Sequence, residues 1–172
     1  MSLRHALLGL LADRSASGYD LLKLFDTSMA NVWPATQSQI YSELNKLADT
    51  GLITVAAEGA RGRKQYALTD DGLAELRHWL TETDPVRNHR SEVLLRVFFL
   101  GVLSRDQAHD YLAGLVATFT KEDEALRELE RSVDWDDGNL SVYGRIALEY
   151  GLRFNVMRRE WAEWAAEQVG QG

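Results

Sequence analysis

The chain has 172 residues, of which 45% are hydrophobic and 26% are charged. This composition is typical of a folded globular protein and excludes a disordered tail. The sequence contains no cysteine, which excludes disulfides, thiolate nucleophiles and cysteine metal sites. It has no run of about 18 apolar residues that could span a membrane. Asp13 and Arg14 stand where a secretory signal would need its cleavage site, so we expect a cytoplasmic protein without a membrane partner.

Charge is distributed unevenly between the two halves of the chain, whose formal net charge is −7. Residues 1–90 carry ten Lys and Arg against eleven Asp and Glu, whereas residues 91–172 carry nine against fifteen. Because a polyanion is repelled by a strongly acidic surface, we expect any such partner to contact the N-terminal half.

The N-terminal half begins with three predicted helices. The first covers the apolar residues 3–12, and the second follows Ser17, which forms a capping-box pattern with Asp20. Pro34 interrupts the chain, and Thr36 with Gln39 predicts the start of a third helix, which Gly51 ends.

The third helix has two distinct faces. Its apolar residues Ile40, Leu44 and Leu47 recur at helical spacing and predict the buried face. On the opposite face a helical projection places Ser38, Ser42 and Asn45, with Tyr41 and Lys46 on the flanks.

A β-hairpin and a fourth helix complete the N-terminal half. Alternating apolar residues at 53–55 and 66–68 predict two strands joined by a turn at 58–63, with basic residues at the tip: Arg61, Arg63 and Lys64. Thr69 predicts the cap of a helix that ends near Leu80. Residues 81–88 contain Pro85 and read as a linker, so we predict domains at 1–84 and 85–172.

The C-terminal half contains only predicted helices. Residues 91–103 are apolar enough for a helix buried on most sides, and Ser104 with Gln107 predicts the start of the next helix. Two long helices follow, with apolar residues at a spacing of about 3.5, as in coiled coils. An antiparallel hairpin packed on itself accounts for half of this pattern. The aromatic content of the last helix favours a homodimer, with an interface at Leu140, Tyr143, Tyr150, Phe154, Met157 and Trp161.

Three short helices followed by a hairpin form the order of a winged helix-turn-helix domain. In such domains the third helix lies in the DNA major groove and the hairpin tip reaches the backbone. The predicted DNA-binding residues are Tyr19, Ser38, Tyr41, Ser42, Asn45, Lys46, Arg61, Arg63 and Lys64. A solvated helix face and an ordinary basic turn are the alternative readings of these residues. The rival function is a winged-helix module that binds an acidic protein, and an enzyme is a distant third.

Three segments of the N-terminal half are distinctive. They are Ser17-Gly18-Tyr19-Asp20, Gln39-Ile40-Tyr41, and above all the segment from Gly62 to Thr69 that reads Gly-Arg-Lys-Gln-Tyr-Ala-Leu-Thr. In these segments the sequence resembles the PadR family of bacterial transcriptional regulators. Residues 91–172 resemble the helical C-terminal domain of virulence-activator-type relatives. The resemblance implies a mostly α-helical protein with a winged helix-turn-helix domain and a helical dimerisation domain. We expect a sequence-specific DNA-binding repressor that acts as a homodimer. It assigns DNA contacts to Tyr19, Tyr41, Lys46, Arg63 and Lys64, whereas Ser38, Ser42 and Asn45 rest on helix geometry alone.

Other kinds of site find little support in the sequence. The four histidines have no partner at metal-ligand spacing, and the Asp-rich segment 134–138 lacks the spacing of a calcium loop, so we expect no metal and no cofactor. We find no pattern of an active site. The tryptophans and phenylalanines leave open a pocket for a small aromatic or apolar effector, although such residues more often form a core or an interface.

Overall fold

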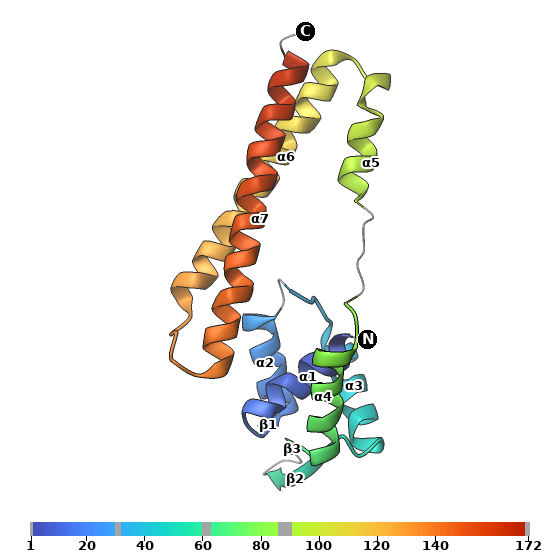
Figure 1. Ribbon diagram of the computed structural model, residues 1–172, viewed down its shortest axis with the longest axis vertical. Helices are drawn as coiled ribbons and strands as arrows, with labels where there is room; N and C mark the ends of the chain where they lie inside the picture. The colour runs from blue at the N-terminus through green and yellow to red at the C-terminus, as the bar shows by residue number, and fades with distance from the viewer. Residues whose placement is uncertain (1, 30–31, 60–62, 86–90, 171–172) are drawn as a thin grey trace. The chain divides into compact units, whose positions relative to one another are not determined.

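The computed structural model describes residues 2–29, 32–59, 63–85 and 91–170 (Figure 1). Its contacts divide the chain into two compact units, Met1–Pro85 and Val86–Gly172, and each unit is described by itself below. The first unit contains α1 (Ser2–Asp13), β1 (Ala16–Ser17), α2 (Gly18–Ser28), α3 (Gln37–Asp49), β2 (Ile53–Gly59), β3 (Arg63–Leu68) and α4 (Asp70–Glu82). The second contains α5 (Glu92–Phe98), the short 3-10 helix η2 (Leu100–Val102), α6 (Arg105–Ser132) and α7 (Asn139–Gly170). The mostly α-helical fold with a winged N-terminal part is confirmed.

A single apolar core holds the first unit together. Leu7 and Leu8 of α1 are fully buried, as are Leu21 and Phe25 of α2. From α3 the buried residues are Ile40, Leu44 and Leu47, the three that the helical spacing predicted. Burial of each such side chain contributes about 1.5–3 kcal/mol, so the core fixes which face of each helix points inward.

Local hydrogen bonds begin and end α3 where the sequence predicts. The Thr36 hydroxyl accepts the Gln39 backbone N–H, and the Gln39 carboxamide oxygen accepts the Thr36 N–H at 2.8 Å. At the other end Gly51 adopts a φ of 73°, and the Leu52 N–H donates to the Leu47 carbonyl at 3.0 Å. This left-handed residue and its hydrogen bond form a Schellman motif, which ends the helix. The capping box of Ser17 and Asp20 on α2 is confirmed in the same way.

The sheet has three strands rather than the two of the predicted hairpin. β1 pairs antiparallel with β3, so that the strand order is β1-β3-β2. Ala16 lies opposite Tyr66, and the Gln65 carboxamide donates to the Ser15 carbonyl at 3.3 Å. A two-residue strand is too short to produce an alternating pattern, so β1 could not be predicted from hydrophobic periodicity.

A close approach joins α4 to the end of α3. The Thr69 hydroxyl accepts the Gly72 N–H and donates to the Gly51 carbonyl at 2.8 Å. A Cβ atom on Gly72 would lie 2.0 Å from the Leu52 carbonyl oxygen, so only glycine fits here.

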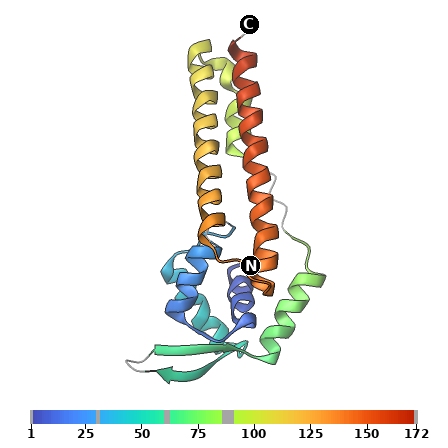
Figure 2. The ribbon, with the colours of Figure 1, turned by 90° about the vertical axis from the view of Figure 1, so that its left-hand side faces the viewer.

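The second unit is built on an antiparallel pair of long helices. Figures 1 and 2 both show α6 and α7 side by side along most of their length. The capping box of Ser104 and Gln107 at the start of α6 is confirmed. Leu112, Phe119 and Leu126 of α6 are buried, as are Leu152, Ala162 and Ala165 of α7. A Cβ on Gly151 would lie 2.9 Å from the Leu126 Cδ1, so the glycine lets the two helices approach closely there.

One expectation for the second unit was wrong. The predicted helix 91–103 is divided between α5 and η2, and none of its residues is buried; Phe98 is 88% exposed. On α7 the buried residues are Leu152, Asn155, Ala162 and Ala165. The large apolar side chains Leu94, Leu95 and Phe98 of α5 and Tyr150 and Phe154 of α7 are exposed in the single chain.

No helix among the described residues is long and apolar enough to cross a membrane.

The contact at Gly72 gives a test of the fold. Gly72→Ala places a methyl group against the backbone of Leu52, so we expect a loss of about 2–3 kcal/mol in the free energy of unfolding. Gly9→Ala is the matched control, because a Cβ there meets nothing within 4 Å and alanine favours a helix by up to about 1 kcal/mol. Denaturant unfolding measures both. Equal stability of the two variants would contradict the close approach.

Candidate nucleic-acid interface

The outer face of α3 carries short polar side chains. Ser38, Ser42 and Asn45 are all exposed, on the side opposite the buried Ile40 and Leu44. Hydroxyl and carboxamide groups of this size let a helix approach the edges of bases and exchange hydrogen bonds with them. Asp49 is exposed on the same side in the last turn, where its charge would repel a phosphate.

One flank of α3 is formed with the first turn of α2. Tyr19 is 58% exposed there, and Tyr41 of α3 is half-buried. A Cβ on Gly18 would lie 2.6 Å from the Tyr41 Cε1, so glycine makes room for the Tyr41 ring. Tyr41 therefore has a packing role that the sequence reading did not foresee, since residues 18 and 41 belong to different helices.

Tyr66 lies under this flank, on β3. The side chain is buried, and desolvation raises the pKa of its phenol, with a smaller contribution from the charge of Tyr41. Its ring closes the core beneath the sheet rather than lying at the surface.

The hairpin of β2 and β3 carries Lys64, one of the three predicted basic residues, on β3. Figure 2 shows β2 and β3 projecting beyond the helices of the first unit. Lys64 is exposed, and its backbone pairs with that of Glu58. Arg61 lies outside the described residues, and of Arg63 the structure describes only the backbone, which pairs with Gly59.

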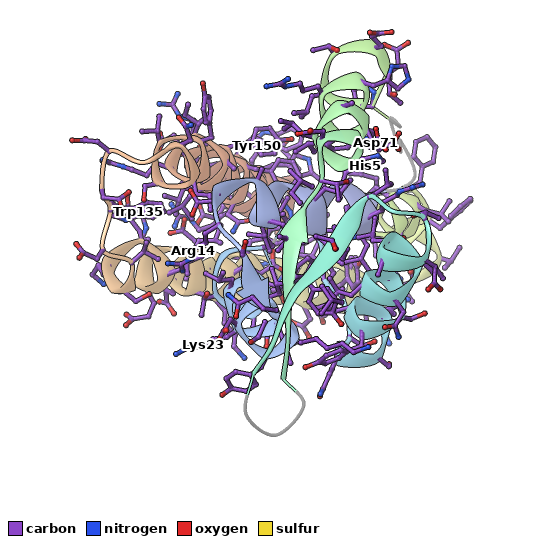
Figure 3. All side chains as sticks on the ribbon, turned by 90° about the horizontal axis from the view of Figure 1, so that it is seen from below. His5, Arg14, Lys23, Asp71, Trp135 and Tyr150 are labelled. Atoms are coloured by element: carbon purple, nitrogen blue, oxygen red, sulfur yellow. The ribbon has the colours of Figure 1, made fainter. Side chains whose placement is uncertain are left out.

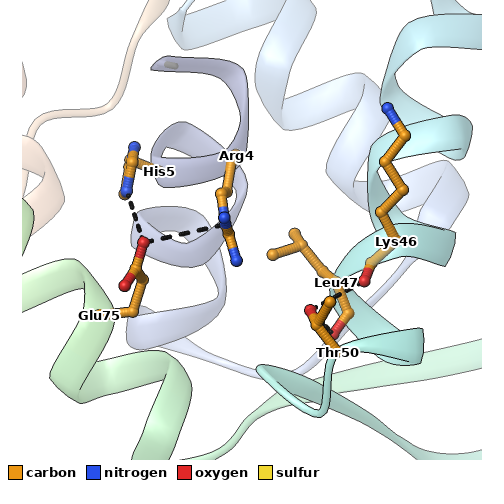
Figure 4. A network of polar contacts seen from close by, with 6 residues as sticks. All are labelled: Arg4, His5, Lys46, Leu47, Thr50 and Glu75. Carbon is orange, nitrogen blue, oxygen red and sulfur yellow. Dashed lines mark hydrogen bonds and ion pairs between the residues drawn. The ribbon is translucent and has the colours of Figure 1, made fainter.

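The other flank of α3 faces α1. Lys46 is exposed, and its Nζ lies 3.3 Å from the Glu43 carboxylate. Across from it, α1 carries Arg4 and His5, both of which approach Glu75 of α4 (Figure 4). Arg4 was missed by the sequence reading because it is separated from α3 by more than thirty positions, and only the packing of α1 on α3 brings them together.

The predicted dimer residues lie on α7. Leu140, Tyr143, Tyr150, Phe154 and Met157 are exposed, and Trp161 is half-buried. The rings of Tyr150 and Phe154 stack with their centroids 6.0 Å apart. These side chains form a continuous apolar surface on the face that α6 leaves uncovered.

A hollow of the second unit lies beside the connection between α6 and α7. Its volume is about 550 Å³, and Trp135 and Arg145 are among its lining residues. The Trp135 Nε1 donates to the Glu130 carbonyl at 2.8 Å, and the Arg145 guanidinium lies 5.9 Å from the ring centroid. Figure 3 shows Trp135 in this connection, with Tyr150 on α7.

Among the described residues, no three His, Asp or Glu side chains lie together in a group that could hold a metal ion.

Comparison with known proteins assigns both units. Residues 7–78 match the model of the transcriptional regulator PadR-like family, and residues 89–169 match that of the virulence activator alpha C-terminal domain. A Mycobacterium tuberculosis protein named "Probable transcriptional regulator Rv1176c" is 30% identical over 98% of both chains. The chain belongs to the PadR-like family of transcriptional regulators.

Two further relatives are similar in sequence and structure. The negative transcriptional regulator PadR of Bacillus subtilis is 40% identical over 112 residues, which span 63% of this chain and 62% of that protein. Its structure in complex with operator DNA has a TM-score of 0.84 at 30% identity, covering 98% of this chain and 99% of the other. Its complex with p-coumaric acid has a TM-score of 0.86 at 29% identity, covering 99% and 100%. The Vibrio cholerae virulence activator AphA gives 0.77 at 28% identity, covering 98% and 96%.

Burial of Tyr66 predicts a titration that can be measured. Because the pKa of Tyr66 is raised in the folded protein, its phenol keeps its proton above a pH of about 10, where the phenol of an unfolded chain loses its proton. The free energy of unfolding therefore falls as the pH rises through this range. We expect the fall to be smaller in Tyr66→Phe. When tyrosinate absorbance is followed against pH, the wild type should show a component at high pH that Tyr66→Phe lacks. Titration curves of the two proteins that differ only in amplitude would contradict this.

Proposed function

We propose that this PadR-like regulator is a homodimer that binds operator DNA through the first unit and represses transcription. The main support for the proposal is that α3 has two different faces. Its apolar face is buried in the core, whereas Ser38, Ser42 and Asn45 are exposed on the opposite face. The complex of Bacillus subtilis PadR with operator DNA, at 30% identity over nearly the whole chain, supports the same role. The name of that relative, a negative regulator, supports repression.

Sequence recognition falls to the outer face of α3 in this proposal. The Asn45 carboxamide can pair with the N6 and N7 atoms of an adenine, and Ser42 one turn earlier can contact the next base pair in the major groove. Both side chains are exposed, so no rearrangement of the domain is required.

Contacts with phosphate position the helix. We assign these to Tyr19 and Tyr41 on the α2 flank and to Lys46 on the α1 flank. The hairpin adds Lys64, with Arg61 and Arg63 assigned from the sequence alone. Such contacts raise affinity for any DNA sequence and make it dependent on salt.

Dimerisation falls to the second unit. Apolar side chains of both α7 and α5 are exposed in the single chain. They include Tyr150 and Phe154 of α7 and Leu94, Leu95 and Phe98 of α5. Uncovered apolar faces of this extent mark an interface, and a symmetric regulator needs a second copy to present two α3 helices to two half-sites.

We further propose control by a small aromatic or apolar effector. Support comes from the complex of Bacillus subtilis PadR with p-coumaric acid and from the hollow beside Trp135 in this chain. Quenching of tryptophan fluorescence by p-coumaric acid, together with release of DNA, is the corresponding assay. As a DNA-binding regulator the protein would act in the cytoplasm and catalyse no reaction.

The experiment that tests the proposed function is DNA binding followed by fluorescence anisotropy. The probe is a duplex from the region upstream of the protein's own gene, compared with a scrambled duplex of equal composition. We expect tighter binding to the upstream duplex by a factor of about 10³ or more. Absence of binding to both would leave the rival protein-interaction module as the better account.

Base reading by α3 can be separated from phosphate contact. We expect Asn45→Ala to lose about 1–3 kcal/mol of binding free energy at the upstream duplex and almost none at the scrambled duplex. The matched control is Lys64→Gln, which should weaken binding to both duplexes alike. If Asn45→Ala weakened both duplexes equally, α3 would not read bases through this face.

The proposed dimer interface can be tested with added charge. Phe154→Glu combined with Met157→Glu buries two carboxylates in the interface, so we expect a monomer by sedimentation at micromolar concentration. Ala113→Glu combined with Ala117→Glu adds the same charge to the exposed side of α6 and should leave the dimer intact. A wild-type monomer, or a dimer that survives the first pair of substitutions, would contradict the assignment.

A further inference from the structure

A hollow of about 390 Å³ lies in the first unit between α1 and the flank of α3. Leu3 and Arg4 of α1 line one side, and Ser38, Ser42 and Lys46 of α3 are on the other. The two serines belong to the outer face of α3, so the hollow opens toward the surface that the proposed function assigns to DNA.

Arg4 has an unusual environment in this hollow. Its side chain is only one third exposed, and its Nε is buried without a hydrogen-bond partner. The nearest charge is the Glu75 carboxylate, 4.0 Å from Nε, and among the described residues the guanidinium makes no hydrogen bond at all. Buried polar groups in proteins are nearly always hydrogen-bonded, and a guanidinium offers five N–H donors. The buried Nε–H of Arg4 therefore has no acceptor among the described residues, and the same side chain lines the hollow.

The residues that line the hollow carry one net positive charge, which favours an anion as the ligand. Arg4 and Lys46 contribute two positive charges, and Glu43 contributes one negative charge that Lys46 already pairs with at 3.3 Å. Glu75 of α4 is not among the lining residues. Its carboxylate lies beside Arg4 and 3.3 Å from the Nε2 of His5, and both of these residues are on α1 (Figure 4). The hydroxyl groups of Ser38 and Ser42 add neutral donors at the rim.

We propose that Arg4 is a further DNA-contacting residue, which together with Lys46 binds one phosphate of the DNA backbone in this hollow. The inference rests on the proposed function, because it adds a contact to the same DNA interface. Arg4 and Lys46 then hold the backbone on the α1 flank of α3, while Tyr19, Tyr41 and the hairpin hold it on the other flank. Phosphate contacts on both flanks of α3 would fix the orientation of this helix in the major groove.

The test compares Arg4→Gln with the wild-type protein on the upstream and scrambled duplexes over a range of salt concentrations. Arg4→Gln leaves Lys46 alone on the phosphate, so we expect the slope of log K against log salt to fall by up to about 0.9 for each half-site, and by up to about 1.8 for the dimer. The upper limit corresponds to about 30-fold weaker binding to both duplexes at about 0.15 M salt. Arg4→Lys keeps the charge and should keep most of the slope.

Glu75→Gln is the matched control for a structural effect. It removes the ion pair of Arg4 but leaves the guanidinium in the hollow, so we expect an unchanged or larger slope. Equal losses in Arg4→Gln and Glu75→Gln would mean that Arg4 acts only by supporting the fold, which would overturn the inference. An unchanged slope in Arg4→Gln would overturn it too, while the proposed function would stand as long as the wild type binds. A change in dimer dissociation with an unchanged slope would instead assign the hollow to a protein contact. Failure of the wild type to bind either duplex would overturn both proposals.

Discussion

The burial of one face of α3 is the constraint on which the first unit depends. Ile40, Leu44 and Leu47 are in the same core as the apolar residues of α1 and α2, and turning the helix about its axis would expose all three to water. At about 1.5–3 kcal/mol for each side chain, such a rotation would cost a large part of the stability of a small domain. The cap at Thr36 and the left-handed Gly51 fix the two ends of the same helix. Its polar outer face is therefore presented to a partner without any further ordering.

In the second unit the packing of α6 against α7 determines which face of α7 stays exposed. Small residues such as Gly151 and Ala162 on the inner face of α7 let it approach α6 closely, and a Cβ on Gly151 would lie 2.9 Å from a methyl carbon of Leu126. The large side chains are thereby left on the outer face. Because Tyr150, Phe154 and Met157 of α7 are exposed, they are available to a second copy of the chain, which is why we assign dimerisation to this unit. The same reasoning covers α5, which has no buried residue of its own.

Features with local causes could be predicted from the sequence, and features with distant causes could not. The capping boxes at Ser17, Thr36 and Ser104 depend on residues three positions apart, and the buried face of α3 depends on helical spacing, so each was predicted correctly. The strand β1 exists only because β3 pairs with it, fifty positions later. The exposure of α5 could not be foreseen, since apolar composition does not say whether the covering surface belongs to the same chain. Arg4 was missed for the same reason as β1, because its place beside α3 follows from packing between helices.

Chemical footprinting on the upstream duplex tests the central claim, that the orientation of α3 in the core determines how the protein contacts DNA. Dimethyl sulfate reports on guanine N7 in the major groove, and hydroxyl radicals report on the backbone. A dimer that places two α3 helices in the groove should protect major-groove positions in two patches about one helical turn, or a multiple of it, apart, with backbone protection flanking each patch. Backbone protection without protection of the major groove would contradict the account, because it would mean that the outer face of α3 does not face the bases.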